Sequence, residues 1–296
     1  MKHLIFLVKV ILGLSYSVMF SQELSPYIKV GVYKNNLNVT YTVVQTALEN
    51  EGFKLIGNYN PENKSTLKVL VFTRDDLQAT TLKVKDRGAL ASALKVAFKT
   101  TSTGTTITYL NPLYLFNAYL RDDFPKYEDE LNIVAEDVER ALSALGSENR
   151  AFGGSIKISE LRDYRYKALM PKFEDKVILK NFSSFDEGVR IIETNLNAGK
   201  GNTKFIYKEV FKVEKVAVFG VGLLDSKTGE GHFLPIIGED HIAALPYEII
   251  LQDKQATILH GRFRIALHWP DLTMGTFMKI MSTPGDIEST LKDLCQ

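Results

Sequence analysis

Four histidines in the C-terminal part of the sequence are the residues with the clearest capacity for metal or acid–base chemistry. They are His232, His241, His260 and His268. A zinc site needs three or four converging ligands, and paired histidines usually lie three to five residues apart. Here the first two are nine residues apart and the last two are eight apart. We therefore predict separate histidines on loops and strand ends, no bound metal, and little loss of stability on His241→Ala.

A second candidate site begins at His260 and ends at Trp269. Within it, Arg262 and Arg264 could bind one carboxylate or phosphate through paired hydrogen bonds, with an aromatic wall nearby. The alternation of Arg262, Phe263 and Arg264 also fits two exposed arginines without a ligand, and we favour that interpretation. The candidate ligand-binding residues are His241, His260, Arg262, Arg264, His268 and Trp269.

Motifs of the common enzyme classes are absent from the sequence. It contains no Gly-x-Ser-x-Gly and no His-Glu-x-x-His motif. Its one cysteine, Cys295, lies too near the chain end to be a buried activated thiol. The glycines between Gly220 and Gly231 do not form a dinucleotide-binding fingerprint, because strands rather than a helix surround them. We therefore assign no catalytic residue and expect no cofactor.

Three classes of function stay open. The leading hypothesis is an exported, non-enzymatic protein that binds a small molecule or an envelope protein. The first alternative is a metal-dependent or hydrolytic enzyme that uses His232, His241, His260 and Asp240. The second alternative is a structural or assembly role.

The composition is that of a folded protein with no strong charge. The chain has 296 residues, of which 45 % are hydrophobic and 24 % are charged, and its net charge is +1. A length near 300 residues suggests about two domains. Nucleic-acid binding requires a concentrated basic face, and no long run of Lys or Arg is present, so we expect no nucleic-acid partner. A single cysteine excludes an internal disulfide.

The N-terminus has the pattern of a secretory signal peptide. Lys2 provides a positive start, and Leu4–Leu14 is apolar except for Lys9. Small residues up to Ser21 then suggest cleavage before Gln22. We predict that 1–21 is removed and that the protein is periplasmic or secreted. No later stretch is long enough for a transmembrane helix, so we expect no stable membrane span after cleavage.

Both halves of the sequence contain strand-like and helix-like patterns in the same order. The predicted strands of the first half are 27–33, 53–59, 67–72, 94–99 and 105–110. Those of the second half are 177–179, 205–210, 216–224, 247–251 and 256–260. Helices are predicted around 43–48 and 131–145 in the first half. In the second half, a capping box at Ser184 and the pair Thr283-Pro284 each predict the start of a helix.

The two halves are also close to one register. Thr106–Tyr109 lies 151 positions before Thr257–His260, and Ala93-Leu94 lies 151 positions before Ala244-Leu245. We interpret this as an internal duplication. The predicted fold class is α+β, with two tandem related domains, each a mainly antiparallel sheet packed with helices. We place the first copy at 22–146, a linker of small and polar residues at 147–160, and the second copy at 161–296.

Two short segments carry a further pattern. Ala244–Leu251 places a Leu-Pro pair directly before a strand, and Ile107–Leu115 ends a strand with Tyr-x-x-Pro-x-x-Leu. In these segments the halves resemble a bacterial family described as domain of unknown function 302. The resemblance covers most of 27–145 and 174–294, although Lys95 replaces the proline of the Leu-Pro pair in the first half. It implies a compact α+β domain in each half and implies no catalytic residues.

Overall fold

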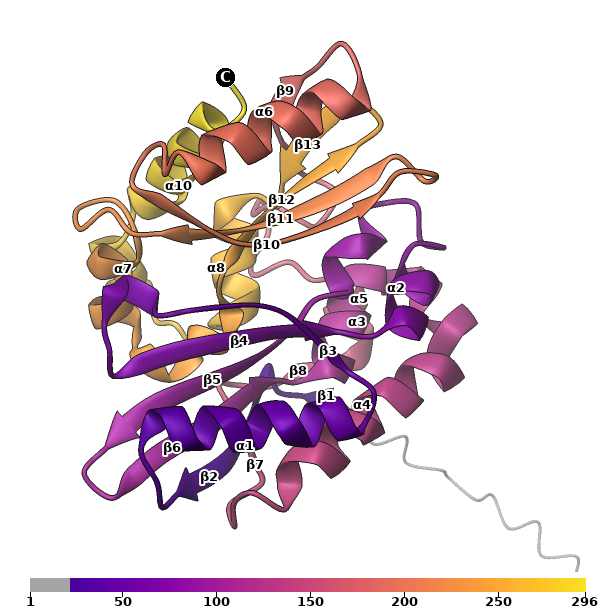
Figure 1. Cartoon of the computed structure of the whole chain (residues 1–296). Coiled ribbons are helices and arrows are strands. Elements are labelled where there is room, and N and C mark those ends of the chain that lie inside the picture. The colour runs from indigo at the N-terminus through magenta and orange to yellow at the C-terminus, as the bar shows by residue number, and fades with distance from the viewer. Residues whose placement is uncertain (1–21) are drawn as a thin grey trace, which may run out of the picture.

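The computed structural model describes residues 22–296, so the predicted signal peptide at 1–21 lies outside the described residues. This part of the chain has an α+β fold with two large antiparallel sheets, which confirms the predicted fold class. In Figure 1 the first sheet lies in the lower half of the molecule and the second in the upper half. No helix among these residues is long and apolar enough to cross a membrane.

The first sheet has the strand order β3-β4-β5-β6-β2-β7. Its strands are β2 (Tyr27–Tyr33), β3 (Lys54–Tyr59), β4 (Leu67–Thr73), β5 (Leu94–Thr101), β6 (Gly104–Leu110) and β7 (Arg150–Phe152). The helices of this unit are α1 (Leu37–Asn50), α2 (Asp75–Thr81), α3 (Pro112–Leu120) and α4 (Glu128–Ser143), with short 3-10 helices η1 (Pro61–Asn63), η2 (Gly88–Ala91) and η3 (Arg121–Tyr127). Helix α1 packs on α4 and on β3, β5 and β6, and so buries Val44 and Leu48 of its apolar stripe.

The second sheet has the strand order β10-β11-β12-β13-β9. Its strands are β9 (Val177–Asn181), β10 (Thr203–Phe211), β11 (Val216–Leu223), β12 (Tyr247–Gln252) and β13 (Gln255–Ile258). The helices of this unit are α6 (Phe185–Asn197), α7 (Glu230–Ile237), α8 (Gly261–His268), α9 (Met274–Lys279) and α10 (Thr283–Asp293), with the 3-10 helix η4 (Glu239–Ala244). Helix α6 packs on four of the five strands.

The two sheets repeat one topology. In the first sheet, β3 to β6 follow one another and β2 pairs with β6. In the second sheet, β10 to β13 follow one another and β9 pairs with β13 in the same way. Thr106–Tyr109 lies on β6 and Thr257 lies on β13, which are equivalent positions. The predicted order of elements is therefore present in both halves. Phe72 and Phe219 are fully buried in β4 and β11, the matching strands.

Local signals explain where several helices begin. The Ser184 hydroxyl accepts a hydrogen bond from the backbone N–H of Glu187 at 3.2 Å, and Glu187 in turn accepts from the backbone N–H of Ser183 at 2.7 Å. These bonds satisfy amides that the first turn of a helix leaves free. The side chain of Asn36 caps α1 in the same way, by accepting from the N–H of Val39. The predicted helix start at Ser184 is confirmed.

The segment predicted to be a linker, 147–160, is built into the fold. Strand β7 pairs with β2, and a second short strand, β8 (Ile156–Lys157), pairs with β1 (Glu23–Leu24) before α5 (Ile158–Arg162) begins. Gly153 and Gly154, between them, have φ angles of 88° and 89°, which glycine adopts without steric cost. The small residues therefore form a tight turn between β7 and β8. These two strands form in spite of their polar composition, because backbone pairing with β2 and β1 does not require apolar side chains.

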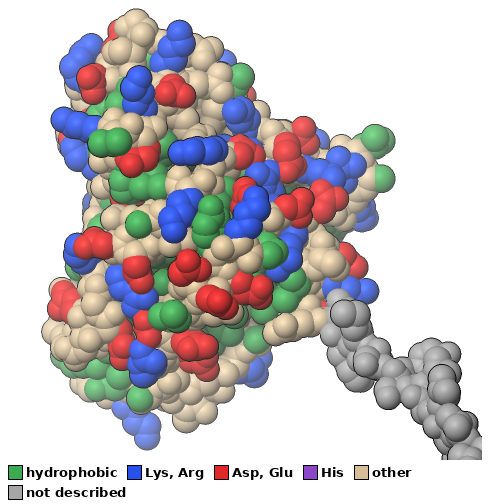
Figure 2. All heavy atoms as spheres, turned by 90° about the vertical axis from the view of Figure 1, so that its right-hand side faces the viewer, with side chains coloured by type: hydrophobic (Ala, Val, Ile, Leu, Met, Phe, Trp, Pro, Cys, Tyr) green, Lys and Arg blue, Asp and Glu red, His purple; other side chains and the backbone are tan. Residues whose placement is uncertain are grey.

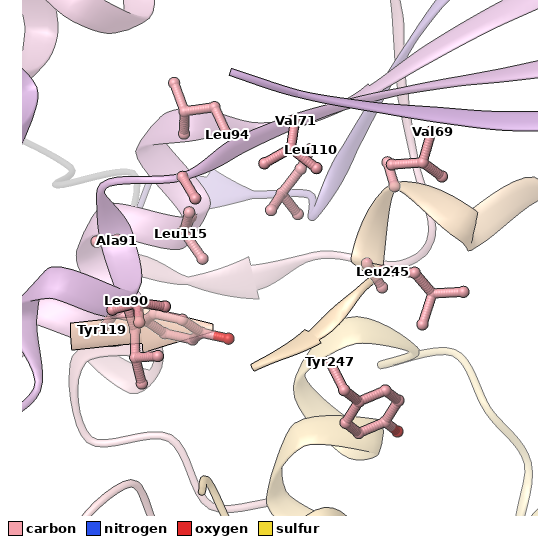
Figure 3. Close-up of a cluster of buried hydrophobic side chains, with 14 of the residues drawn as sticks. Val69, Val71, Leu90, Ala91, Leu94, Leu110, Leu115, Tyr119, Leu245 and Tyr247 are labelled. Atoms are coloured by element: carbon pink, nitrogen blue, oxygen red, sulfur yellow. The ribbon is translucent and has the colours of Figure 1, made fainter. Parts of the chain in front are cut away.

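The two units share one buried core. Val69, Val71 and Leu110 of the first unit belong to the same cluster of buried side chains as Leu245 and Tyr247 of the second, part of which Figure 3 shows. The outer strands β3 and β10 also contact each other. Gly57 permits this approach, because a Cβ atom at that position would lie 2.5 Å from the carbonyl oxygen of Ile206. The two units therefore pack directly against each other.

Candidate ligand-binding site

Helix α8 divides the predicted site residues into two groups. The segment after β13 was expected to alternate as a strand, but the ring Nδ1 of His260 accepts a hydrogen bond from the N–H of Arg262 at 3.2 Å and caps a helix instead. Because successive helical residues point in different directions, Arg262 lies on the outer surface while Arg264 is 2 % exposed. The two arginines therefore do not form one clamp, and only Arg262 is exposed as predicted.

The inner side of α8 joins a buried ionic network between the two units. The Nη2 atom of Arg264 donates to the carbonyl oxygens of Ala244 at 2.5 Å and Pro246 at 2.9 Å, and lies 3.3 Å from a carboxylate oxygen of Glu248. The other oxygen of Glu248 accepts a hydrogen bond from Lys95 of the first unit at 2.6 Å. Glu248 thus bridges a cation from each half.

His268, the last residue of α8, is also buried. Its Nε2 atom lies 3.1 Å from the hydroxyl of Tyr119, and its carbonyl oxygen accepts from the hydroxyl of Tyr27 at 2.8 Å. Burial lowers the pKa of His268 well below its ordinary value, and the positive charges of Arg264 and Lys95 lower it further. His268 is therefore a neutral, structural residue at neutral pH.

His241 was expected in a solvated loop, and this prediction was wrong. Its side chain is only 13 % exposed, and its ring lies 5.1 Å from the Tyr27 ring and 5.9 Å from the Trp269 ring. Burial lowers the pKa of His241, although Asp271 and Asp240 act in the opposite direction. The sequence could not indicate this burial, because η4 is covered by strands β5 and β6 of the other unit.

The outer side of α8 forms a wall of an apolar pocket with a volume of about 250 Å³. The residues that we use to define this methionine pocket are Met170, Met274, Met278, Met281, Trp269 and Arg262. The chain has six methionines, and the four that fall within 22–296 all line this one pocket. Arg262 is the one charged residue in the wall. Such a pocket can hold an apolar group, with room for a negative charge beside the guanidinium.

Helix α9 covers the methionine pocket loosely. None of its residues is buried, and the exposed fractions of Met274, Met278 and Met281 are between 48 % and 56 %. The Thr273 side chain caps the helix by accepting from the N–H of Thr276 at 3.2 Å. Because a segment with few buried contacts opens at low free-energy cost, α9 is suited to move over a ligand.

The residues proposed for a metal-dependent enzyme occupy separate elements. His232 lies on α7, His241 and Asp240 lie on η4, and His260 caps α8. Asp240 accepts a hydrogen bond from Lys99 at 3.1 Å. Within 22–296, no group of three or more His, Cys, Asp or Glu side chains is placed to hold a metal ion.

Sequence reasoning found two of the pocket residues, Arg262 and Trp269, and missed the methionines. The spacing of Met274, Met278 and Met281 by four and three residues places them on one face of a helix and was the available signal. Met170 comes from a distant loop, so only the structure could add it to the group.

Comparison with solved structures gives a distant likeness. No family model matches the chain, and no curated protein matches it. Among solved structures, it is similar to an uncharacterized conserved protein from Bacillus stearothermophilus that is described as DUF302. The two are 20 % identical, with a TM-score of 0.32, and the match covers 42 % of this chain and 98 % of that chain.

Proposed function

We propose that the protein is an exported, non-enzymatic binding protein that holds a small amphipathic ligand in the methionine pocket. The observation that carries this proposal is the convergence of all four methionines of 22–296 on one apolar pocket. Thioether side chains are flexible and polarizable, so they adapt to apolar ligands of different shape. Three of these methionines are about half exposed. A ligand in the pocket would remove part of their apolar surface from water, which favours binding.

The position of Arg262 in the pocket wall favours a ligand with a negatively charged end. Its guanidinium is exposed and forms no ion pair with the residues from 22 to 296. The other lining residues provide no second charge. A carboxylate held there would gain a charge-assisted hydrogen bond, while its hydrocarbon part would lie among the methionines and the Trp269 ring.

We also propose that the protein is exported and that its two halves arose by duplication. The apolar stretch Leu4–Leu14 with its small-residue end supports export to the periplasm or the medium. The common strand order of the two sheets and the segments Ala244–Leu251 and Ile107–Leu115 support two divergent copies of a domain of unknown function 302.

Trp269 permits a direct test, because it is the one tryptophan of the chain and lines the methionine pocket. Titration with straight-chain fatty acids should change its fluorescence in a saturable way. Alcohols of the same chain length should bind more weakly. Arg262→Ala should weaken carboxylate binding about tenfold, or about 1.4 kcal/mol, and leave alcohol binding unchanged.

Two variants control this test. Met278→Asp places a charge in the pocket wall and should weaken both ligand series. Val213→Asp changes an exposed valine in the turn between β10 and β11 and should leave both series unchanged. A fluorescence signal that no fatty acid or alcohol alters would contradict the proposal.

A further inference from the structure

The mouth of the methionine pocket is an exposed apolar surface. Leu169 is 99 % exposed, and Met274, Met278 and Met281 are about half exposed. Single exposed apolar residues are common on soluble proteins. Here they surround one opening, because Met170, the neighbour of Leu169, lines the same pocket as the other three methionines. We call this surface the mouth patch.

Leu169 lies at a loop tip in a costly conformation. Its φ angle is 68°, in the left-handed region that a leucine rarely adopts. Its side chain buries almost nothing against the protein. The strained backbone has a free-energy cost, and the exposed leucine side chain gains no packing within the chain to offset that cost. We therefore expect Leu169 to contact an apolar surface outside the chain.

Unpaired cations surround the mouth patch. They are Lys167, Arg262 and Lys279. None of them forms an ion pair with the described part of the chain, whereas Lys172 on the same loop pairs with Asp163. Three further carboxylates lie near this edge: Asp271 is 3.9 Å from a ring nitrogen of His241, and the charges of Asp175 and Glu288 act on His260 beside Arg262. The mouth patch is therefore apolar at its centre, and the three cations at its edge have no ion-pair partner among residues 22–296.

The face shown in Figure 2 differs from this arrangement. There, Lys and Arg side chains are interspersed with Asp and Glu, and neither sign occupies a continuous area. Apolar side chains with unpaired cations at their edge match the chemistry of an anionic bilayer surface, where apolar groups enter the boundary of head groups and chains and cations meet phosphates.

We propose that the mouth patch docks on the surface of an anionic phospholipid bilayer. Leu169 and the three half-exposed methionines would enter the head-group boundary, and Lys167, Arg262 and Lys279 would lie at the level of the phosphates. The docked pocket would open toward the lipid, so that an amphipathic ligand could pass between bilayer and protein. That last consequence rests on the proposed function, whereas the docking itself does not.

The test is sedimentation of the protein, residues 22–296, with vesicles of two compositions. Vesicles that contain phosphatidylglycerol should bind it, phosphatidylcholine vesicles should bind it weakly, and added salt should weaken the binding. Leu169→Asp should reduce binding to phosphatidylglycerol vesicles more than tenfold. Lys167→Glu combined with Lys279→Glu should reduce it at least as much, because each cation near an anionic surface contributes about a fivefold factor.

Val213→Asp is the matched control. Val213 is 91 % exposed and lies close to Lys212 and Lys215, but it belongs to the turn after β10. Its replacement should leave vesicle binding unchanged. The inference would be overturned if Val213→Asp caused an equal loss of binding, or if the protein bound both lipids equally. It would also be overturned if the protein did not bind phosphatidylglycerol vesicles, a result that would favour a protein partner.

A ligand titration separates this inference from the proposed function. Leu169 does not line the methionine pocket, so Leu169→Asp should leave the Trp269 fluorescence response to fatty acids intact. Loss of vesicle binding with normal fatty-acid binding supports docking by the mouth patch. Normal vesicle binding with no fatty-acid response in the unaltered protein would support docking and contradict the proposed ligand.

Discussion

Helices α3 and α8 follow equivalent strands in the two units but have different surroundings. Helix α3 is enclosed by α4, α5, η2 and η3, and every residue from Tyr114 to Leu120 is buried. Helix α8 packs on α10 and on the interior, but its outer side is covered only by the loosely packed α9 and the loop around Met170. A position that is filled by packed helices in one half is thus an open pocket in the other.

This difference is the basis for proposing a ligand-binding site in only one half. The inner side of α8 is held by the Lys95, Glu248 and Arg264 network, so the helix itself is fixed. Arg262 and the residues of α9 can then vary without loss of the fold, because these residues are not buried. A fixed helix is a suitable wall for the proposed pocket, because binding residues on rigid elements keep their geometry.

The largest expected effect tests the fixed inner side. Glu248→Ala leaves Lys95 and Arg264 buried without their carboxylate, and removal of one partner from a buried pair costs about 3–5 kcal/mol. Denaturant unfolding would measure this loss. Arg262→Ala on the outer side should change stability by less than about 0.5 kcal/mol. Equal effects of the two changes would remove the distinction between the sides of α8.

A second prediction concerns the pH dependence of the contact between the units. Glu230 on α7 accepts hydrogen bonds from the Tyr59 hydroxyl at 2.8 Å and from the backbone N–H of Glu62 at 3.1 Å. Burial raises the pKa of Glu230 to about 7, from an ordinary value near 4.5. The folded state therefore binds this proton more tightly than the unfolded state. Its contribution to stability is complete below about pH 4.5 and is lost as the pH rises through 7.

The shift corresponds to at most about 3 kcal/mol. Other groups titrate in the same range, and the lowered pKa of His268 acts in the opposite direction. The informative quantity is therefore the difference in unfolding free energy between the unaltered protein and Glu230→Gln, measured from pH 4 to pH 8. That difference should shift in favour of the variant as the pH rises, and a constant difference would contradict the prediction.

A third, smaller effect is expected at His241. Because its ring is largely buried against Tyr27, Phe152 and Trp269, His241→Ala should cost about 2 kcal/mol. This replaces the expectation of little effect that the sequence suggested. Thermal unfolding would measure the loss, and a change within error would show that the ring contributes no packing.

The smallest effect is expected at the cover of the methionine pocket. Met278→Ser removes an exposed apolar side chain from a helix without buried residues, so stability should change by less than about 0.5 kcal/mol. Amide hydrogen exchange should show α9 opening far more often than α3. Equal protection of the two helices would contradict the view that α9 is an adaptable cover.

Sequence patterns predicted the strands and their repeated order because each strand carries its own signal. Val69 to Phe72 and Val216 to Phe219 are apolar runs with valine at alternate positions, and Ser184 caps its helix through neighbours in sequence. These features are local, so no partner is needed to recognise them.

The candidate site was predicted only in part because its properties depend on distant contacts. Arg264 and His241 have the sequence appearance of exposed polar residues. Arg264 is buried against Ala244, Pro246 and Tyr247, and His241 is buried partly against Tyr27 of the first unit, contacts that the local sequence does not indicate. The methionine pocket combines 166–170, 262–269 and 272–281, which come together through α8. Arg262 and Trp269 were found because an arginine near a tryptophan suggests a ligand even without a fold.

The central claim is that the methionine pocket holds a small amphipathic ligand. Native mass spectrometry of the protein purified from its native source tests this claim most directly. The account predicts a bound molecule of low mass that bears an acidic group. That molecule should be absent from Met278→Asp and present in Val213→Asp. Purified protein with the mass of the bare chain alone, or a bound molecule retained by Met278→Asp, would contradict the account.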